Sequence, residues 1–367
     1  MNRPPLTSPG WKSTGCNRDL RSTRRQRGAV LILVALLLPV LLGLCALAVD
    51  VALVFLVRNE LQNVADAAAL SGAAKLYSGE GGPIDEPNFS AAASTAGEAI
   101  TLNRSIGVEL EDVTVASGFW PVHGADGPPV LTTNPGPRDV PALQVTIWRG
   151  EGANGGAVPL HFARALGLSS LAVSASAVAA VAPVAAVGAG EVFPLVVTEC
   201  LYQQYWNAAA SPPGPKLDPS TGLPYVLRIG ADYTYQGCKA GSVSSLESDV
   251  SNLASLQALL TSRNASLLKY GSRVWLQPSF DESFFASIDA CSGGGNGQCT
   301  QVVVPVVGNA EGHSQVAITA FACLNIQRAS WGGENYIQVA MTRNCIARNA
   351  GGAGINYGVL GSARLVL

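Results

Sequence analysis

The stretch "LAVDVALVFLVRNELQNVADAAALSGAAKL", residues 47–76, decides the fold, because it joins membrane-like sequence to a water-soluble helix without a break. The uncharged run before Asp50, residues 29–49, is 21 residues long. A helix of that length rises about 32 Å, close to the ~30 Å hydrocarbon core of a bilayer. With the apolar residues that follow Asp50, the sequence predicts a transmembrane helix over residues 29–57, kinked at Pro39.

Asp50 falls at the predicted outer boundary of the span, where an ionised carboxylate costs far less than at the midplane. Three roles stay open for it: an interfacial charge, an ion pair with Arg58 two turns later, or a contact with another subunit. A cleaved signal peptide does not fit, because the apolar run exceeds the usual core of about 7–15 residues and resumes after Asp50. The sequence therefore predicts a retained anchor.

Charge is unevenly distributed along the chain of 367 residues, whose formal net charge is −2. Residues 1–28 hold seven Arg and Lys residues against Asp19 alone, so the remaining residues are acidic overall. A basic arm directly before an apolar run is typical of a cytoplasmic flank. Nucleic-acid binding is not predicted, because no second basic surface follows this arm.

Small residues line one side of the predicted helix beyond the membrane. Ala65, Ala69 and Ala73 are spaced four residues apart, so they share one face of a helix that we expect to continue from residue 29 to residue 76, amphipathic in its later half. Such a face lets a second helix or a sheet pack closely. The alternative is that the alanines only raise helix propensity. Both interpretations stay open.

The residues of this region match a known pattern. The segment "RGAVLILVALLLPVLLGLCALAVDVALVFLVRNELQNVADAAALSGAAKL", residues 27–76, closely resembles the amino-terminal segment of the TadE/TadG-like family of tight-adherence (Tad, or Flp) pilus-assembly proteins. A later stretch, "VPLHFARALGLSSLAVSASAVA" at residues 158–179, is similar to the end of the first extracytoplasmic region in TadG-like members.

The resemblance implies a non-enzymatic, single-pass protein of the bacterial inner membrane, with a cytoplasmic amino end and periplasmic carboxy-terminal domains. Its implied partners are the lipid bilayer, Tad pilus-assembly components and, as a further expectation, pilin subunits; no cofactor and no small-molecule substrate are implied. Prepilin-type subunits are cut after a glycine and carry glutamate at the fifth mature position. A cut at Gly28-Ala29 would place Leu33 there, so a TadG-like assembly factor is favoured over a minor pseudopilin that is cleaved after Gly28 and enters the fibre.

Past the helix, residues 58–185 predict an α+β head. Alternating apolar residues indicate strands at 108–115, 142–148 and 171–181. Ser90 is a candidate N-cap for a short helix over residues 91–104. A long amino-terminal helix followed by a few antiparallel strands is a pilin-like arrangement.

Residues 186–367 predict a second, mainly-β domain with disulfides. Its strands are expected at 224–229, 273–278, 301–307, 315–326, 335–342 and 358–367, with one amphipathic helix over 245–260. Six cysteines on the predicted outer side fit an oxidising compartment, and no zinc-like Cys or His spacing accompanies them. Six cysteines allow 15 pairings. Order along the chain suggests the neighbour pairs Cys200–Cys238, Cys291–Cys299 and Cys323–Cys345.

The sequence predicts no catalytic, cofactor or metal residues. His123, His161 and His313 are far apart in sequence, and no nucleophile elbow, phosphate-binding loop or zinc-protease motif occurs. The stretch "DVSNL" at residues 249–253 has leucine where a DxSxS metal site needs its second serine. Asp281, Glu282 and Asp289 are expected to form a solvated rim rather than an acid/base pair. A membrane-tethered hydrolase is therefore disfavoured.

Overall fold

The computed structural model describes residues 27–77, 86–121, 130–136, 139–210, 212–230, 233–277, 282–343, 345–352 and 354–366. The fold is mixed α+β, as predicted, with an amino-terminal apolar helix, several β-sheets and three disulfides. The chain divides into two compact units. One comprises Met1–Leu53 with Leu160–Ser169, and the other comprises Val54–Pro159 with Ser170–Leu367.

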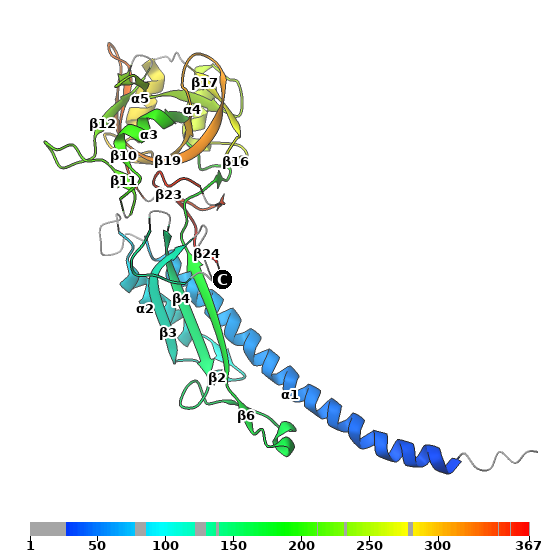
Figure 1. The fold of residues 1–367 in the computed structure, drawn as a ribbon. Coiled ribbons are helices and arrows are strands. Elements are labelled where there is room, and N and C mark those ends of the chain that lie inside the picture. The colour runs from blue at the N-terminus through cyan, green and yellow to red at the C-terminus, as the bar shows by residue number, and fades with distance from the viewer. Residues whose placement is uncertain are drawn as a thin grey trace, which may run out of the picture. The chain divides into compact units, whose positions relative to one another are not determined.

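Helix α1 (Arg27–Ala74) is one uninterrupted helix of 48 residues that contains Pro39, drawn in blue in Figure 1. Its first part is apolar enough to cross a membrane and carries its apolar side chains exposed. Its later part buries one face at Val57, Leu61, Val64, Ala65, Ala68, Ala69 and Ala73. These positions repeat every three or four residues, which is the spacing of one helix side. The first part of the helix thus exposes its apolar surface, and the later part buries one face against protein.

The first sheet has four antiparallel strands in the order β24-β7-β4-β3. Its strands are β3 (Val113–Pro121), β4 (Asp139–Arg149), β7 (Val173–Ala180) and β24 (Arg364–Leu365). Helix α2 (Phe89–Thr101) lies against β3 and β4. The prediction of Ser90 as its N-cap is wrong, because Asn88 caps the helix by accepting a 3.0 Å hydrogen bond from the Ala91 N–H. Strand β24 comes from the carboxy-terminal end of the chain and pairs with the edge of β7.

The strand predicted at 108–115 is interrupted in the structure. Strand β2 (Val108–Glu109) pairs with β1 (Arg104–Ser105), and β3 begins only at Val113. Between them, the buried Asn154 side chain accepts hydrogen bonds from the Glu111 and Asp112 N–H groups at 2.8 and 3.0 Å. A side-chain partner thus replaces the ladder partner that a continuous strand would need.

The second sheet has seven strands in the order β12-β20-β19-β17-β15-β9-β18, and β18 also pairs with β19. Five of its strands, from β19 through β17, β15 and β9 to β18, therefore form a closed ring of pairings, with β20 and β12 added outside. The bounds are β9 (Leu195–Thr198), β12 (Val226–Ile229), β15 (Gly241–Leu246), β17 (Arg273–Gln277), β18 (Gln301–Val307), β19 (Gln315–Ser330) and β20 (Tyr336–Met341).

Three helices belong to this part: α3 (Glu199–Tyr205), α4 (Leu253–Ser262) and α5 (Glu282–Cys291). The helix predicted over 245–260 is wrong in its first half, because β15 continues to Leu246. Helix α4 begins after Asn252, whose side chain caps it by accepting a 2.9 Å hydrogen bond from the Ser255 N–H. Helix α5 buries Phe284 and Phe285 in the core.

Short elements complete the fold. They are β5 (Val158–Pro159), the 3-10 helix η1 (Ala163–Leu166), β6 (Ser170–Leu171), β8 (Ala186–Val187), β10 (Trp206–Asn207), β11 (Gly214–Pro215), β13 (Thr234–Tyr235), β14 (Cys238–Lys239), β16 (Leu268–Lys269), β21 (Cys345–Ala347), β22 (Ala350–Gly351) and β23 (Val359–Gly361).

The disulfides join Cys200 to Cys238, Cys291 to Cys299 and Cys323 to Cys345. All three lie in the carboxy-terminal half of the chain, around the seven-stranded sheet. Cys45 is a free, exposed thiol in the apolar part of α1, and Cys16 lies outside the described residues.

Candidate assembly interface

The carboxylate of Asp50 is buried and binds three consecutive backbone N–H groups. His161 and Phe162 each donate a hydrogen bond to it at 2.8 Å, and Ala163 donates one at 2.6 Å. The aspartate is only 2% exposed. Its partners begin the segment Leu160–Ser169, which we call the clasp loop and which belongs to the same compact unit as residues 1–53. The carboxylate thus holds the clasp loop against the membrane helix.

Of the roles considered for Asp50 in the sequence, the ion pair with Arg58 does not form in the structure. Arg58 is exposed, and among the described residues no ion pair joins it to Asp50. The partner is the chain's own backbone, 111 residues later. The clasp loop lies in the stretch that resembles TadG-like proteins, but nothing in that resemblance indicates that Asp50 binds it.

The small-residue face of α1 is buried within the head. Ala65 and Ala69 are completely buried and Ala73 is 1% exposed. Gly72, next to them, lies so close to Leu143 of β4 and to Ala92 and Ala96 of α2 that a Cβ would collide with all three. The small side chains therefore bring α1 against α2 and the four-stranded sheet.

Polar side chains of α1 fasten the helix to the rest of the head. Glu60 Oε2 accepts hydrogen bonds from Ser105 Oγ and from the Ile106 N–H, both at 2.9 Å. Gln62 Nε2 donates to Asp66 Oδ1 at 2.7 Å and to the Ser176 carbonyl at 3.2 Å. Helix α1 is thus tied to the β1–β2 turn and to β7.

Two family matches cover these elements. Residues 28–75 match the Tad family, described as putative Flp pilus-assembly TadE/G-like, and residues 71–179 match the Tad_C family, described as putative Tad-like Flp pilus-assembly. The chain belongs to the TadE/G-like Flp pilus-assembly family. This membership supports a role in Tad pilus assembly. No curated protein and no solved structure matches the chain.

The matched segments contain the span, the clasp loop, the buried alanines and most of the first sheet. The seven-stranded sheet of this TadE/G-like protein lies beyond them, in residues 180–366. The family assignment therefore rests on the anchor and the head.

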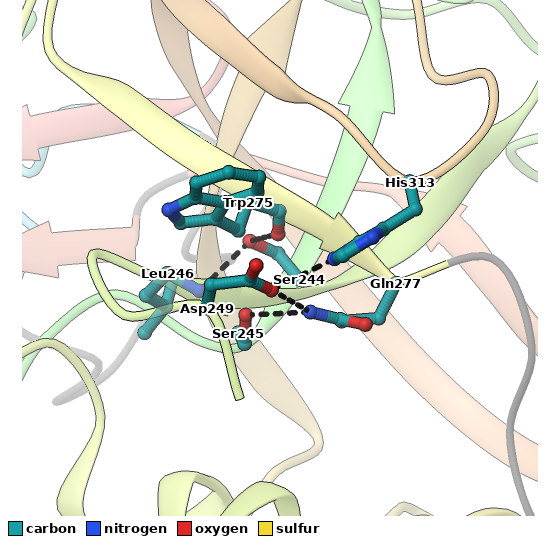
Figure 2. A network of polar contacts seen from close by, with 7 residues as sticks. All are labelled: Ser244, Ser245, Leu246, Asp249, Trp275, Gln277 and His313. Carbon is teal, nitrogen blue, oxygen red and sulfur yellow. Dashed lines mark hydrogen bonds and ion pairs between the residues drawn. The ribbon is translucent and has the colours of Figure 1, made fainter. Parts of the chain in front are cut away.

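A polar network at the seven-stranded sheet contains an aspartate, a histidine and two serines (Figure 2). Asp249 Oδ1 lies 2.7 Å from His313 Nε2 and accepts a 3.1 Å hydrogen bond from Gln277 Nε2. The same Gln277 amide also donates to Ser245 Oγ at 3.1 Å. Among the described residues, no serine hydroxyl is hydrogen-bonded to His313. The hydrogen bond between nucleophile and base that a hydrolase triad requires is therefore missing there. The network links β15 and β17 to the segment before β19.

Of the other candidate groups of this TadE/G-like protein, Asp289 has a structural partner. Asp289 Oδ1 accepts a 2.9 Å hydrogen bond from the Ala329 N–H and so fastens α5 to β19. Glu282 is exposed, whereas Asp281 and His123 lie outside the described residues. Within the described ranges, no three His, Cys, Asp or Glu side chains gather as a metal site would require.

A polar cavity of about 520 Å³ lies beside the seven-stranded sheet and is lined by Glu191, Arg263 and Arg348, among others. The Arg263 guanidinium stands 4.4 Å from the centre of the Phe193 ring, and its burial lowers the pKa of this side chain to about 10. Glu191 Oε1 accepts hydrogen bonds from the Arg348 and Asn349 N–H groups at 3.1 and 3.0 Å. These contacts hold the chain leaving the first sheet against the segment that follows β21.

Proposed function

We propose that this protein is an envelope-anchored structural or assembly factor of a Tad (Flp) pilus system and acts without catalysis. The observation that carries the proposal is the division of α1, whose first part exposes apolar side chains over a membrane-spanning length and whose later part is buried in the head. Together with the family membership, this arrangement suits a protein that presents a fixed head at the membrane to other Tad components.

The proposed topology is a single pass through the bacterial inner membrane, with the amino end in the cytoplasm. Two observations support it. The basic arm at residues 1–28 is the usual cytoplasmic flank. The three disulfides all lie on the other side of the span, where an oxidising compartment would keep them. Alkaline phosphatase fused after Leu76 should then be active, and a stable but inactive fusion would reverse the orientation.

Removal of the protein tests the assembly role directly. Cells that lack it should display few or no Tad pili, and the wild-type chain should restore them. The partners expected in crosslinking from the head are Tad assembly components and pilin subunits. Normal pili without the protein would contradict the proposal.

Processing separates the assembly factor from a minor pseudopilin. Mass spectrometry of the membrane-extracted protein should find peptides that cross Gly28-Ala29, because Leu33 stands where prepilins carry glutamate. A mature terminus at Ala29, with the protein present in sheared fibres, would instead identify a pseudopilin.

A further inference from the structure

The clasp loop exposes large apolar side chains next to the membrane helix. Phe162 is 50% exposed, Leu166 75% and Leu168 58%. Leu160 and Ala163, in contrast, are buried at 8% and 3%. The loop therefore has an inner side, held by Asp50, and an outer side that would leave three large apolar groups in water.

Most N–H groups of the clasp loop have hydrogen-bond partners within the protein. The first N–H group, of Leu160, donates to the Ser169 carbonyl at 3.0 Å, and the next three donate to Asp50. The loop then closes on itself, with Gly167 and Leu168 donating to the Arg164 and Ala163 carbonyls at 3.0 and 3.1 Å. Irregular backbone is tolerated at membrane depth only when its polar groups have protein partners. These N–H groups of the clasp loop meet that requirement.

The position of Asp50 along α1 places the loop at lipid level. The apolar surface of the helix does not stop at the aspartate, because Val51, Phe55 and Leu56 beyond it are 46%, 59% and 51% exposed. Residues 29–57 would rise about 44 Å as a helix, more than the ~30 Å of the hydrocarbon core. Asp50 thus lies at the edge of the bilayer or just inside it, where three hydrogen bonds from N–H groups offset the cost of its charge.

We propose that the clasp loop is a second membrane contact, in which Phe162, Leu166 and Leu168 enter the bilayer surface beside α1. The partner is lipid rather than protein, because the loop is held at Asp50, whose neighbours along the span, Val49 and Val51, are themselves apolar and 54% and 46% exposed. The exposed cation of Arg164 suits the anionic headgroup layer at the same level. The proposal rests on the membrane anchor described under the proposed function, but not on any role in pili.

A second membrane contact would restrict the motion of the helix. A single span is free to rotate about its own axis in the bilayer. A loop that is fixed to one side of the span and also enters the lipid surface restricts that rotation and fixes the depth of Asp50.

The test uses the full chain in vesicles of phosphatidylethanolamine and phosphatidylglycerol, with an environment-sensitive fluorophore on one cysteine at a time. Cys16→Ser is common to all variants. The first variant labels the native Cys45. The others carry Cys45→Ala with either Leu166→Cys in the clasp loop or Leu223→Cys in the carboxy-terminal part, where Leu223 is 65% exposed. Each label is challenged with lipids that carry a quencher near the headgroup or deep in the acyl chain, and with iodide in the water.

The label at Leu166→Cys should lose fluorescence to the shallow lipid quencher and resist iodide, whereas the label at Leu223→Cys should do the reverse. Adding Asp50→Ala should reduce the lipid quenching at position 166. Quenching by iodide but not by lipid would overturn the proposal, and protection from both quenchers would overturn it in favour of a protein contact. The Cys45 label distinguishes failure of the clasp-loop proposal from failure of the membrane-anchor proposal. If the Cys45 label is not quenched by the deep lipid quencher, the proposal that α1 spans the membrane is contradicted.

Discussion

Gly72 of α1 lies so close to Leu143 of β4 that a Cβ atom on the glycine would stand 2.6 Å from Leu143 Cδ2. The same Cβ would stand 2.7 Å from the backbone oxygen of Ala92 and 2.9 Å from Ala96 Cβ. A leucine side chain can turn away, but the backbone of α2 cannot do so without moving the helix. We therefore expect Gly72→Ala to lower the free energy of unfolding by about 1–3 kcal/mol, the usual cost of overpacking.

Gly97 of α2 is the matched control, because a Cβ there would meet open space. Alanine is the better helix former, so Gly97→Ala should raise the free energy of unfolding by up to about 1 kcal/mol. Denaturant unfolding of the two variants measures both effects. If both variants changed the free energy of unfolding in the same direction, the close approach at Gly72 would not contribute to stability.

The buried alanine face gives a second prediction. Leucine is nearly as good a helix former as alanine, so Ala69→Leu changes packing far more than propensity. Because Ala69 is completely buried, the added volume should reduce the amount of folded protein and the number of pili. Ala67→Leu, on the exposed side of the same helix, should do neither. Immunoblots and pilus counts compare the two, and equal pilus output would leave the alanines with no packing role.

The clasp of Asp50 can be measured by proteolysis of the detergent-solubilised protein, because Arg164 offers trypsin an exposed cleavage site in the clasp loop. Asp50→Ala removes a charged acceptor, and hydrogen bonds to charged groups contribute about 1.5–3 kcal/mol each. The loop should then open more often and be cut at least about tenfold faster.

Asp66→Ala is the control for this experiment. Asp66 lies on the same helix and accepts a hydrogen bond only from Gln62 in the described structure, so its loss should leave cleavage after Arg164 unchanged. Cleavage of Asp50→Ala at the wild-type rate would mean that the three hydrogen bonds do not hold the loop.

Asn264 is predicted to be a major determinant of stability in the carboxy-terminal part. It is 1% exposed, accepts from the Glu191 and Val192 N–H groups at 2.9 and 2.8 Å, and donates to the Gly188 and Ser266 carbonyls at 2.7 Å each. Each buried group left without a partner costs about 1–3 kcal/mol. Asn264→Ala should therefore lower the melting temperature markedly, whereas Asn309→Ala, at an exposed position, should not.

Buried tyrosines make stability sensitive to alkaline pH. Burial raises the pKa of the Tyr202 phenol well above its ordinary value, and burial also raises the pKa of Tyr357, whose ring centre is 4.5 Å away. A raised folded-state pKa gives stability that is complete below the unfolded pKa of about 10 and is lost as the pH rises above it. The melting temperature should therefore fall above about pH 10.

Tyr202→Phe should make the melting temperature fall less steeply at alkaline pH. The variant also loses the 3.2 Å hydrogen bond that the Tyr202 hydroxyl donates to the Cys323 carbonyl. Melting curves from neutral to alkaline pH measure the slope. An unchanged slope in Tyr202→Phe would show that ionisation of this phenol is not what destabilises the fold.

The elements that the sequence predicted well are those set by a local apolar pattern. Helix α1 was expected over residues 29–76 and spans Arg27–Ala74, and β18 occupies the predicted residues 301–307. In both segments, the spacing of apolar residues decides the structure without distant partners. Caps are harder to predict, because Asn88 and Ser90 are both good capping residues two positions apart and only the path of the chain selects Asn88.

Contacts between distant segments could not be predicted. The three N–H groups that bind Asp50 carry no side-chain signature, since any sequence supplies backbone donors. Likewise, Asn154 divides the predicted strand at 108–115 from more than forty residues away. Helices α3 and α5 were missed because each is short and lies among apolar strands.

Strand β24 makes the connection between the two sheets a double one. The chain passes from β7 toward β8 once, and near its end it returns to the edge of β7, where Val366 donates a 2.8 Å hydrogen bond to the Val178 carbonyl. A single covalent link would let one sheet rotate relative to the other, whereas two separate attachments transmit torque. A pull on the seven-stranded sheet loads the β24–β7 hydrogen bonds together, in shear. Load applied to the disulfide-bonded part would therefore reach the head through two attachments instead of one.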